Sequence, residues 1–238
     1  MTLRAALFGA RGGIGAALAA QLCADPAYAE VWIGSRSPLP ATTPSARPFT
    51  FDSDDEASLA AAAAAIGGEL DLVLVATGLL HREGLPLPEK SYRALDPAAM
   101  AELYRANTIG PAMIAKHLLP LLPRSRRAVF AVLSARVGSI GDNRLGGWHS
   151  YRAAKAALNM LVANFAIECR RSNPLAVIAA LHPGTVDTPL SAPFQRGLPA
   201  GQVQSSQASA AALLGFLARL SAEQSGGLFA ADGTRLPW

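Results

Sequence analysis

Charged residues are scarce in this chain of 238 residues: they make up only 16% of it, and just three of its 21 basic residues are lysines. Hydrophobic residues make up 51%, a proportion that excludes an intrinsically disordered chain. A chain of this length and composition is large enough to fold as one α/β domain with a sizeable core.

Cysteine and long apolar runs are also scarce. The two cysteines, Cys23 and Cys169, both fall in expected helices and do not form the framework of a disulfide-rich protein. No run reaches the roughly eighteen apolar residues that span a membrane, and the chain enters a strand and a glycine loop too early for a signal peptide. We therefore predict a cytoplasmic protein without a membrane segment.

Basic residues outnumber acidic ones, 21 against 17, which gives a net charge of +4 and a pI near 9.4. They are scattered, however, and the densest cluster is only Arg124, Arg126 and Arg127. A few arginines that serve one anionic cofactor explain the excess as well as a polyanion does. We predict neither a nucleic-acid surface nor a metal site.

A glycine-rich turn follows the first apolar run. Residues 5–8 are typical of a buried parallel strand, and the Ala- and Leu-rich segment that ends near residue 24 is typical of a helix. Between them lie Gly9, Arg11, Gly13, Ile14 and Gly15. A turn in this position presents backbone N–H groups and a helix N-terminus to a pyrophosphate. An ordinary tight turn is the alternative, because the spacing Gly-x-x-x-Gly-x-Gly differs from the general dinucleotide fingerprint.

The end of the second strand bears on the choice of cofactor. Residues 31–33 are followed by Ser35 and Arg36, where the general fingerprint has an Asp or Glu roughly twenty residues after the loop. A hydroxyl and a guanidinium bind a 2′-phosphate that a carboxylate would repel, and Arg11 adds a second cation. We therefore favour NADP(H) over NAD(H). The alternative is that Arg36 is a solvated loop residue.

The next two strands add candidate cofactor contacts. Asp52, after the third short run, accepts a hydrogen bond from an adenine amino group, or belongs only to the acidic start of the following helix. The fourth strand, residues 70–76, stops at Ala76, Thr77 and Gly78. Ligands of parallel sheets bind outside the carboxyl ends of the strands, so we expect these residues to face the cofactor.

Two polar residues of the central region are candidates for the reaction site. Asn107 lies within a helix expected from about residue 97, where asparagine is unfavourable, so it either holds a water near the site or occupies a polar surface position. Ser134 directly follows the fifth strand, residues 128–133.

Tyr151 and Lys155 are one helical turn apart in an Ala- and Leu-rich helix expected to end near residue 171, so they project from the same face. A nearby ammonium favours the phenolate, and we expect it to lower the tyrosine pKa from about 10 towards neutrality. A tyrosine tuned in this way exchanges a proton with a reacting oxygen. Taken alone, a surface tyrosine and a solvated lysine would explain the pair.

The last third is expected to shape the substrate site. A sixth strand, residues 176–181, ends at a segment that contains Pro183, Gly184, Val186 and Thr188. A substrate loop is predicted at about 185–205, followed by a helix at about 206–220 and a seventh, edge strand that begins at Gly226.

Taken together, these motifs resemble those of the short-chain dehydrogenase/reductase family over essentially the whole chain. The matching residues are Gly9, Gly13 and Gly15, then 76–78, Asn107, the serine after the fifth strand, Tyr151, Lys155, Pro183 and Gly184. Residues 134–143 resemble the branch that contains the C-factor signalling protein and the sniffer-type carbonyl reductases. The resemblance implies one α/β, Rossmann-type three-layer domain over residues 1–238, with a doubly wound, mostly parallel sheet of seven strands in the order 3-2-1-4-5-6-7.

The resemblance also implies roles for the residues. Tyr151 is the acid/base, Lys155 lowers its pKa and binds the nicotinamide ribose, and Asn107 orders a proton-relay water. The residues implied to line the cofactor are Gly9, Arg11, Ile14, Arg36, Asp52, Ala76 and 183–188. Homodimers or homotetramers, packed through the helices of Asn107 and Tyr151, are implied as well.

The chain departs from the family pattern at the catalytic serine. The family has this serine three residues before the glycine that follows the fifth strand, and here that position is Ala135, not Ser134. Side chains alternate along a strand, so a shift of one residue turns the hydroxyl away unless the backbone bulges. Either Ser134 is presented by a bulge, which is our prediction, or Ser139 reaches in, or this donor is missing.

Two functions fit these observations. The favoured one is an NADP(H)-dependent oxidoreductase that transfers hydride between the cofactor and a carbonyl or secondary alcohol: a ketone, aldehyde or quinone. The alternative is a nucleotide-binding regulatory or signalling protein of C-factor type with a vestigial dehydrogenase site.

Overall fold

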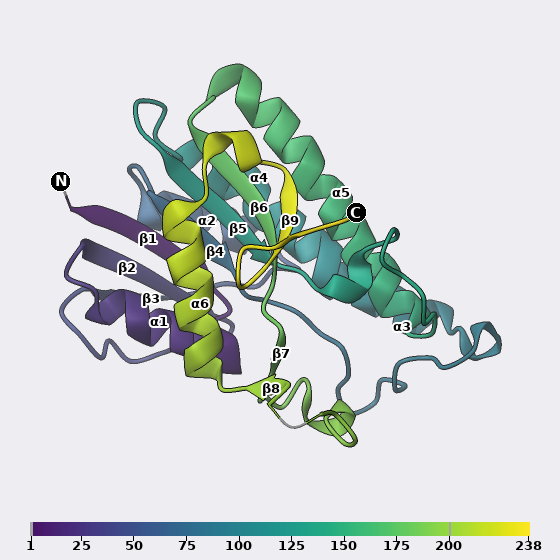
Figure 1. Ribbon diagram of the computed structural model, residues 1–238. Coiled ribbons are helices and arrows are strands. Elements are labelled where there is room, and N and C mark those ends of the chain that lie inside the picture. The colour runs from purple at the N-terminus through teal and green to yellow at the C-terminus, as the bar shows by residue number, and fades with distance from the viewer. Residues whose placement is uncertain (1, 200) are drawn as a thin grey trace.

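The computed structural model describes residues 2–199 and 201–238, and a single large sheet runs through its centre (Figure 1). Among these residues, eight strands pair in the order β10-β9-β6-β5-β4-β1-β2-β3. The strands are β1 (Leu3–Phe8), β2 (Tyr28–Ser35), β3 (Ala46–Thr50), β4 (Leu72–Val75), β5 (Ala128–Leu133), β6 (Ala176–His182), β9 (Gly227–Ala230) and β10 (Arg235–Leu236). All neighbours pair in parallel except β9 and β10.

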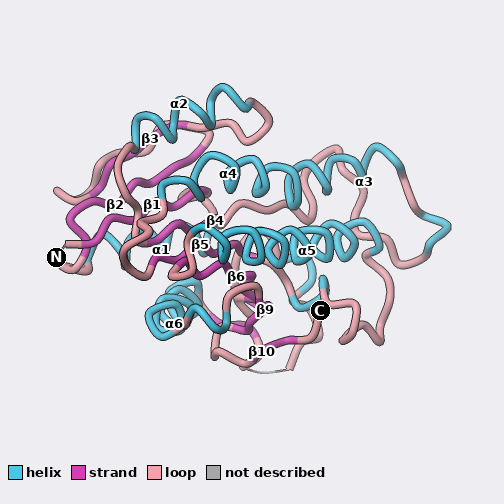
Figure 2. The backbone as a smooth tube through the Cα atoms, turned by 90° about the horizontal axis from the view of Figure 1, so that it is seen from above, coloured by secondary structure: helices cyan, strands magenta, loops and turns pink. Residues whose placement is uncertain are grey.

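Helices cover both faces of this sheet, which gives three layers (Figure 2). They are α1 (Gly13–Ala24), α2 (Glu56–Ile66), α3 (Pro97–Tyr104), α4 (Gly110–Leu118), α5 (His149–Ser172) and α6 (Ser206–Arg219). Side chains of α2, α4 and α5 pack on one face, and those of α1 and α6 pack on the other. Strands buried on both faces need no polar alternation, which is why they appear in the sequence as continuous apolar runs.

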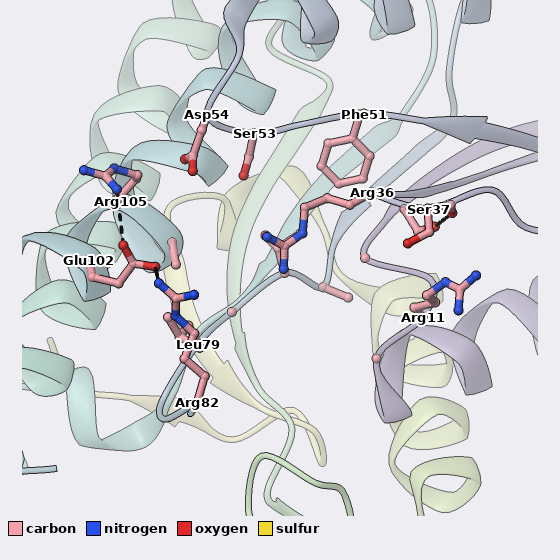
Figure 3. Close-up of a pocket in the computed structure, with 17 residues that line it drawn as sticks. Arg11, Arg36, Ser37, Phe51, Ser53, Asp54, Leu79, Arg82, Glu102 and Arg105 are labelled. Carbon is pink, nitrogen blue, oxygen red and sulfur yellow. Dashed lines mark hydrogen bonds and ion pairs between the residues drawn. The ribbon is translucent and has the colours of Figure 1, made fainter. Parts of the chain in front are cut away.

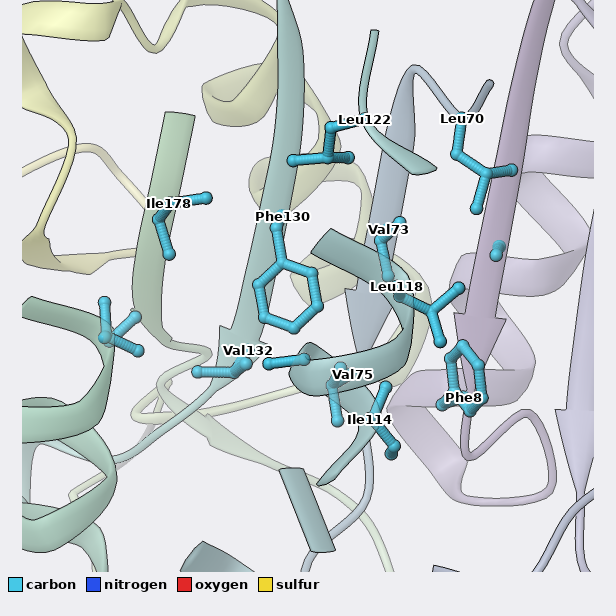
Figure 4. Close-up of a cluster of buried hydrophobic side chains, with 14 of the residues drawn as sticks. Phe8, Leu70, Val73, Val75, Ile114, Leu118, Leu122, Phe130, Val132 and Ile178 are labelled. Atoms are coloured by element: carbon cyan, nitrogen blue, oxygen red, sulfur yellow. The ribbon is translucent and has the colours of Figure 1, made fainter. Parts of the chain in front are cut away.

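The core on the α2–α4–α5 face is the larger of the two main clusters (Figure 4). Phe8 of β1 and Phe130 of β5 have no exposed surface, and Ile114 and Leu118 of α4 pack against them. Burial of a side chain of this size stabilises the fold by about 1.5–3 kcal/mol. This packing fixes α4 and α5 against the strands whose ends carry the candidate site.

The predicted fold class is confirmed, and the predicted number of strands is wrong by one. The sheet contains an additional strand, β10, which forms an antiparallel pair with β9. β10 has only two residues, too few to produce a hydrophobic pattern. The local sequence indicates this strand only through the turn dipeptide Asp232-Gly233. This dipeptide, with Gly233 at φ +94°, closes the hairpin between β9 and β10.

The expected substrate loop also contains secondary structure. Two short strands, β7 (Thr185–Val186) and β8 (Val203–Gln204), pair in parallel at the two ends of this segment. Ala200, which falls inside the predicted loop, lies outside the described residues.

The strand order runs from β1 through β2 to β3 on one side and from β4 through β5 to β6 on the other, so it switches direction between the parallel neighbours β1 and β4. A sheet of this kind has a crevice at this point, outside the carboxyl ends of its strands. The turns after β1, β2, β4, β5 and β6 all open on that edge, so the topology brings the predicted site residues together.

Candidate active site

The glycine turn after β1 is packed so closely that its glycines leave no room for a side chain. A Cβ on Gly9, whose φ is +98°, would lie 2.9 Å from the carbonyl carbon of Ala76. On Gly15 it would lie 2.1 Å from the carbonyl oxygen of Gly9, and on Gly13 2.6 Å from Cγ2 of Thr188. The turn therefore brings backbone, instead of side chains, to the centre of the crevice.

The N-terminus of α1 has features of a phosphate site. Helices α2, α3 and α6 are capped by the side chains of Asp55, Asp96 and Ser205. Within the described residues, no side chain caps α1, whose N-cap is Gly12, and its first turn has no acidic residue. Free N–H groups and the positive end of the helix dipole favour an anion here. The predicted pyrophosphate fits this position.

A cavity of about 360 Å³ extends from the glycine turn towards the ends of β2 and β3 (Figure 3). Its lining includes the predicted residues Gly9, Arg11, Ser35, Arg36, Ala76, Thr77 and Gly78. Figure 3 shows Arg36 reaching across the cavity near Phe51, with Arg11 on the same side. Arg36 is exposed and, among the described residues, has no hydrogen bond or ion pair, so its guanidinium is available to an anion. Arg11 donates one bond of 2.9 Å to the carbonyl of Pro38.

Two of the predicted adenosine contacts are engaged within the chain. The Ser35 hydroxyl donates to the carbonyl of Ser37 inside the turn after β2. The Asp52 carboxylate accepts a 3.0 Å bond from the Asp54 N–H, and Asp52 is not part of the cavity lining. Phe51, Ser53 and Asp54 line it instead. The hydrogen bond from an adenine amino group to Asp52 therefore stays a prediction.

The opposite wall of this cavity carries charged residues that sequence reasoning missed. Arg82 and Arg105 each donate to the Glu102 carboxylate, at 2.9 and 3.2 Å (Figure 3). Arg82 follows β4, whereas Glu102 and Arg105 lie on α3 and just after it. Only the folded chain brings Arg82 to Glu102, whereas Glu102 and Arg105 are three residues apart and pair locally.

A second cavity, of about 310 Å³, lies on the other side of the glycine turn and holds the predicted reaction residues. The residues that line it include Ile14, Ser134, Tyr151, Lys155, Pro183 and Thr188. The two cavities share part of their lining: Arg11, Gly12 and residues 76–78. The structure thus places Tyr151 and Lys155 beside the mouth of the glycine turn.

Tyr151 and Lys155 are both almost completely buried on α5, and the ammonium lies 5.9 Å from the centre of the phenol ring. Burial raises the pKa of the Tyr151 phenol above its ordinary value. Burial also lowers the pKa of Lys155 from 10.5 to about 7, and Nζ donates a 2.9 Å bond to the carbonyl of Leu133. The expectation that Lys155 lowers the Tyr151 pKa towards neutrality is wrong for the chain by itself, because burial raises this pKa.

Asn107 lies in a single π-helical turn, η2 (Arg105–Ile109), between α3 and α4. Its side chain is fully buried and bonds to backbone: Nδ2 donates to the carbonyls of Leu79 (2.7 Å) and Leu103 (3.0 Å), and Oδ1 accepts from the Leu79 N–H (3.1 Å). A Cβ on Gly78 would lie 3.2 Å from Oδ1. Asn107 therefore fixes the chain just after β4, and its role towards a proton-relay water stays a prediction.

Ser134 and Ala135 face different neighbours at the end of β5. The Ser134 hydroxyl donates a 2.7 Å bond to Oδ1 of Asn159 on α5, although Ser134 also contributes to the lining of the second cavity. Ala135 packs against the apolar cluster that contains Tyr151. Ser139, the other candidate, accepts a 3.1 Å bond from the N–H of Asp142. Of the two residues at the end of β5, Ser134 lines the cavity of Tyr151 with its hydroxyl engaged by Asn159, whereas Ala135 is not part of that lining.

A polar atom without a partner lies between the two cavities. The Thr77 hydroxyl is buried and, among the described residues, makes no hydrogen bond, yet Thr77 lines both cavities. A buried hydroxyl of this kind normally has a partner, so the site leaves one for a ligand or a water. This observation supports the fit of a nucleotide across the two cavities.

The segment after β6 closes the second cavity from the side of the substrate loop. Gly184 has φ +81°, and a Cβ there would lie 2.5 Å from Nε2 of Gln204, which donates a 2.6 Å bond to the carbonyl of Pro183. Val186 is buried, and Gly184 and Val186 are not part of the cavity lining, whereas Pro183 and Thr188 are.

Aromatic rings form the wall next to Tyr151. The Trp148 ring centre lies 6.4 Å from that of Tyr151 and 4.9 Å from that of Phe194 in the substrate loop. His81, from the loop after β4, lies 5.5 Å from Phe194. Its Nε2 is 3.2 Å and 3.1 Å from the carbonyls of Pro189 and Leu190. These three rings therefore place an aromatic surface beside the phenol of Tyr151.

The family model described as short chain dehydrogenase matches residues 4–198 of this chain. The chain belongs to the short-chain dehydrogenase family. It is therefore an oxidoreductase of that family, and the sequence-based assignment is confirmed.

Two relatives illustrate the range of this family. The chain is 34% identical over 144 residues to the C-signal protein of Myxococcus xanthus. This matched segment makes up 60% of this chain and 81% of that protein. It is 33% identical over 183 residues to the 1-hydroxy-2-glutathionyl-2-methyl-3-butene dehydrogenase of a Rhodococcus species, over 76% of this chain and 74% of that protein.

Two solved structures share the fold. The NADPH-bound carbonyl reductase from chicken fatty liver is 26% identical, with a TM-score of 0.85 over 100% of this chain and 95% of that chain. The carbonyl reductase Sniffer of D. melanogaster also has a TM-score of 0.85 over the full length of both chains, at 21% identity. The identity to C-signal supports the resemblance to the C-factor branch, and the Sniffer structure shares the fold.

None of the helices in residues 2–199 and 201–238 is long and apolar enough to cross a membrane. The same residues contain no cluster of His, Cys, Asp or Glu that would hold a metal ion.

Proposed function

We propose that this protein is an NADP(H)-dependent oxidoreductase that interconverts a carbonyl compound, such as a ketone, aldehyde or quinone, and the corresponding alcohol. The main support is that Tyr151 and Lys155 line one cavity together with the glycine turn at the start of α1. A phenol and a dinucleotide-type turn at one crevice are the parts that such a reaction needs.

The chain's own residues perform the proton chemistry. When bound, the nicotinamide would supply or accept the hydride. Tyr151 carries its proton at neutral pH, as its pKa is not lowered from the ordinary value, so its hydroxyl donates to the oxygen of a carbonyl placed in the second cavity. Lys155 in its ammonium form lies beside the phenol ring and compensates negative charge on it as the proton leaves.

Arg36 and Arg11 support the choice of NADP(H). Both line the first cavity, and no carboxylate occupies the residue positions that follow β2 in the described chain, Ser35 to Ser37. A 2′-phosphate placed there meets two guanidinium groups, which bind phosphate as paired donors.

The test is oxidation of NADPH over a panel of ketones, aldehydes and quinones, with Tyr151→Phe as the inactive variant. Loss of one acid catalyst lowers turnover by about a hundredfold or more. Tyr92→Phe is the matched control, because Tyr92 is exposed and remote from both cavities.

A regulatory protein of C-factor type is the second candidate. It is favoured by the similarity to C-signal and by the methyl group of Ala135 beside Tyr151. This candidate is preferred if three results are obtained together. The protein binds NADPH, it turns over no compound of the panel, and the Tyr151→Phe variant retains the biological effect of the wild type.

We also propose that the protein acts as a homodimer or homotetramer. Ile109, Met160 and Ile167, from the α4 and α5 side of the molecule, expose large apolar side chains. These helices lie side by side on one face (Figure 2). Light scattering measures the mass, and Met160→Lys with Ile167→Lys is expected to yield a monomer.

A further inference from the structure

The chain enters α5 through three consecutive residues in the left-handed region. Gly146, Gly147 and Trp148 have φ values of +61°, +65° and +51°. Glycine adopts this conformation freely, but at a tryptophan it costs about 1–2 kcal/mol. Such a conformation persists only where surrounding contacts hold it.

Those contacts come from Glu89, 61 residues before Ser150 in the sequence. Within the described residues, Trp148 at the N-cap of α5 provides no side-chain cap. Instead, the Glu89 carboxylate accepts a 3.3 Å bond from the Ser150 N–H and a second bond from the Ser150 hydroxyl. The Glu89 carbonyl accepts a 2.5 Å bond from the Trp148 N–H.

Glu89 is buried, with 7% of its surface exposed, and Ser150 has none exposed. A buried glutamate is rare unless its oxygens are bonded, and here one oxygen receives an N–H and the other an O–H. A carboxylate at this end of α5 also complements the positive end of the helix dipole. The loop between β4 and α3 thus caps α5 from outside that helix.

We propose that Glu89 is a positioning residue for Tyr151. Tyr151 follows Ser150 directly, so the anchor on Ser150 sets the position of the first turn of α5 and hence of the phenol. The same anchor holds Trp148, whose ring stands between Tyr151 and Phe194. This assignment rests on the proposed function, because it is the acid/base role of Tyr151 that makes its position matter.

The sharpest variant is Glu89→Gln, which keeps the shape of the side chain. Glutamine keeps one oxygen that can accept from the Ser150 N–H, but its NH₂ must donate to a Ser150 hydroxyl turned round to accept, and both charge-assisted bonds become neutral ones. We expect kcat to fall by about tenfold or more, because small displacements of a reacting group are costly. The KM for NADPH should stay within about twofold, because the glycine turn and Arg36 are untouched. Ser150→Ala, which removes one bond only, should act in the same direction and more weakly.

Two control variants separate positioning from loss of stability. Asp96→Ala removes the cap of α3, a 2.7 Å bond to the Ala99 N–H, and should lower the melting temperature without lowering kcat. Glu83→Gln makes the same chemical change at an exposed position and should change neither the melting temperature nor kcat. A kcat of Glu89→Gln within about twofold of wild type, or a loss equalled by Asp96→Ala, overturns the proposal.

Hydrogen exchange provides a readout that does not depend on turnover. In Glu89→Gln, faster exchange should be confined to a peptide that spans Trp148 to Lys155, whereas the Asp96→Ala variant should show it only in α3. If the wild-type protein reduces no carbonyl, the proposed function fails, and hydrogen exchange alone then tests whether Glu89 holds the first turn of α5. Unchanged exchange in the peptide then overturns the role of Glu89.

Discussion

The Ser134 hydroxyl donates a 2.7 Å hydrogen bond to Oδ1 of Asn159, and the Asn159 amide donates in turn to the carbonyl of Gly138 at 3.2 Å. Both side chains are buried, so this short chain of bonds ties the end of β5 to the middle of α5. The serine next to the candidate site is therefore held by a structural partner, and its neighbour Ala135 packs against the apolar cluster that contains Tyr151.

Replacement of Ser134 by alanine is expected to weaken the fold. It leaves Oδ1 of Asn159 without its donor in a buried position, which costs about 1–3 kcal/mol of the free energy of unfolding. Urea denaturation measures this loss. A drop of about a hundredfold in kcat with unchanged stability would contradict this and make Ser134 the donor to the substrate oxygen.

Ala135→Ser is expected to raise turnover of simple ketones. A hydroxyl at this position faces the Tyr151 cluster and adds a second donor to the oxygen that develops negative charge. One such donor contributes about a hundredfold in other enzymes, so we expect a gain of tenfold or more in kcat/KM. The double variant with Tyr151→Phe should show no gain. If it gains equally, the new hydroxyl acts in some other way.

NADPH affinity is expected to decrease above pH 7. Burial lowers the Lys155 pKa to about 7, so the ammonium predominates below this pH and is lost above it. The resemblance assigns that ammonium to the nicotinamide ribose, so binding above pH 7 requires uptake of a proton and weakens by up to about tenfold per pH unit. Fluorescence titration from pH 6 to 9 measures the dissociation constant. The Lys155→Met variant should bind NADPH more weakly, with a dissociation constant that does not change with pH. If its dissociation constant rises with pH as steeply as that of the wild type, Lys155 is not the cause.

Arg36→Ala is expected to remove the preference for NADPH. It deletes the guanidinium that reaches into the first cavity, so the dissociation constant for NADPH should rise by about tenfold while that for NADH changes little. Arg93→Ala is the matched control, because Arg93 is an exposed arginine outside both cavities. Equal weakening of both nucleotides would show that Arg36 does not bind the 2′-phosphate.

Features that depend on local sequence were predictable. The run 128–133 is observed as β5 with these bounds, because an unbroken apolar segment between polar residues has one plausible structure. Gly9 and Gly15 indicated a close backbone turn, since no other residue fits there.

Features that depend on distant contacts were not predictable in the same way. The raised pKa of Tyr151 results from burial by residues of several elements, whereas the sequence shows only the lysine one turn away. The carboxylate of Glu89 and the first turn of α5 are 61 residues apart, and nothing local to either indicates the contact. Arg82 meets Glu102 for the same reason.

The pairing of β7 with β8 holds the two ends of the predicted substrate loop together. Thr185 and Val186 lie beside Val203 and Gln204, so both ends of the intervening segment are fixed next to each other while its middle carries Phe194. Within that segment Thr188 lies against Gly13 of the glycine turn, whereas changes around Phe194 are expected to alter which molecules are admitted. Relatives with other substrates can therefore diverge here first, by insertion or exchange of side chains, without rebuilding the sheet.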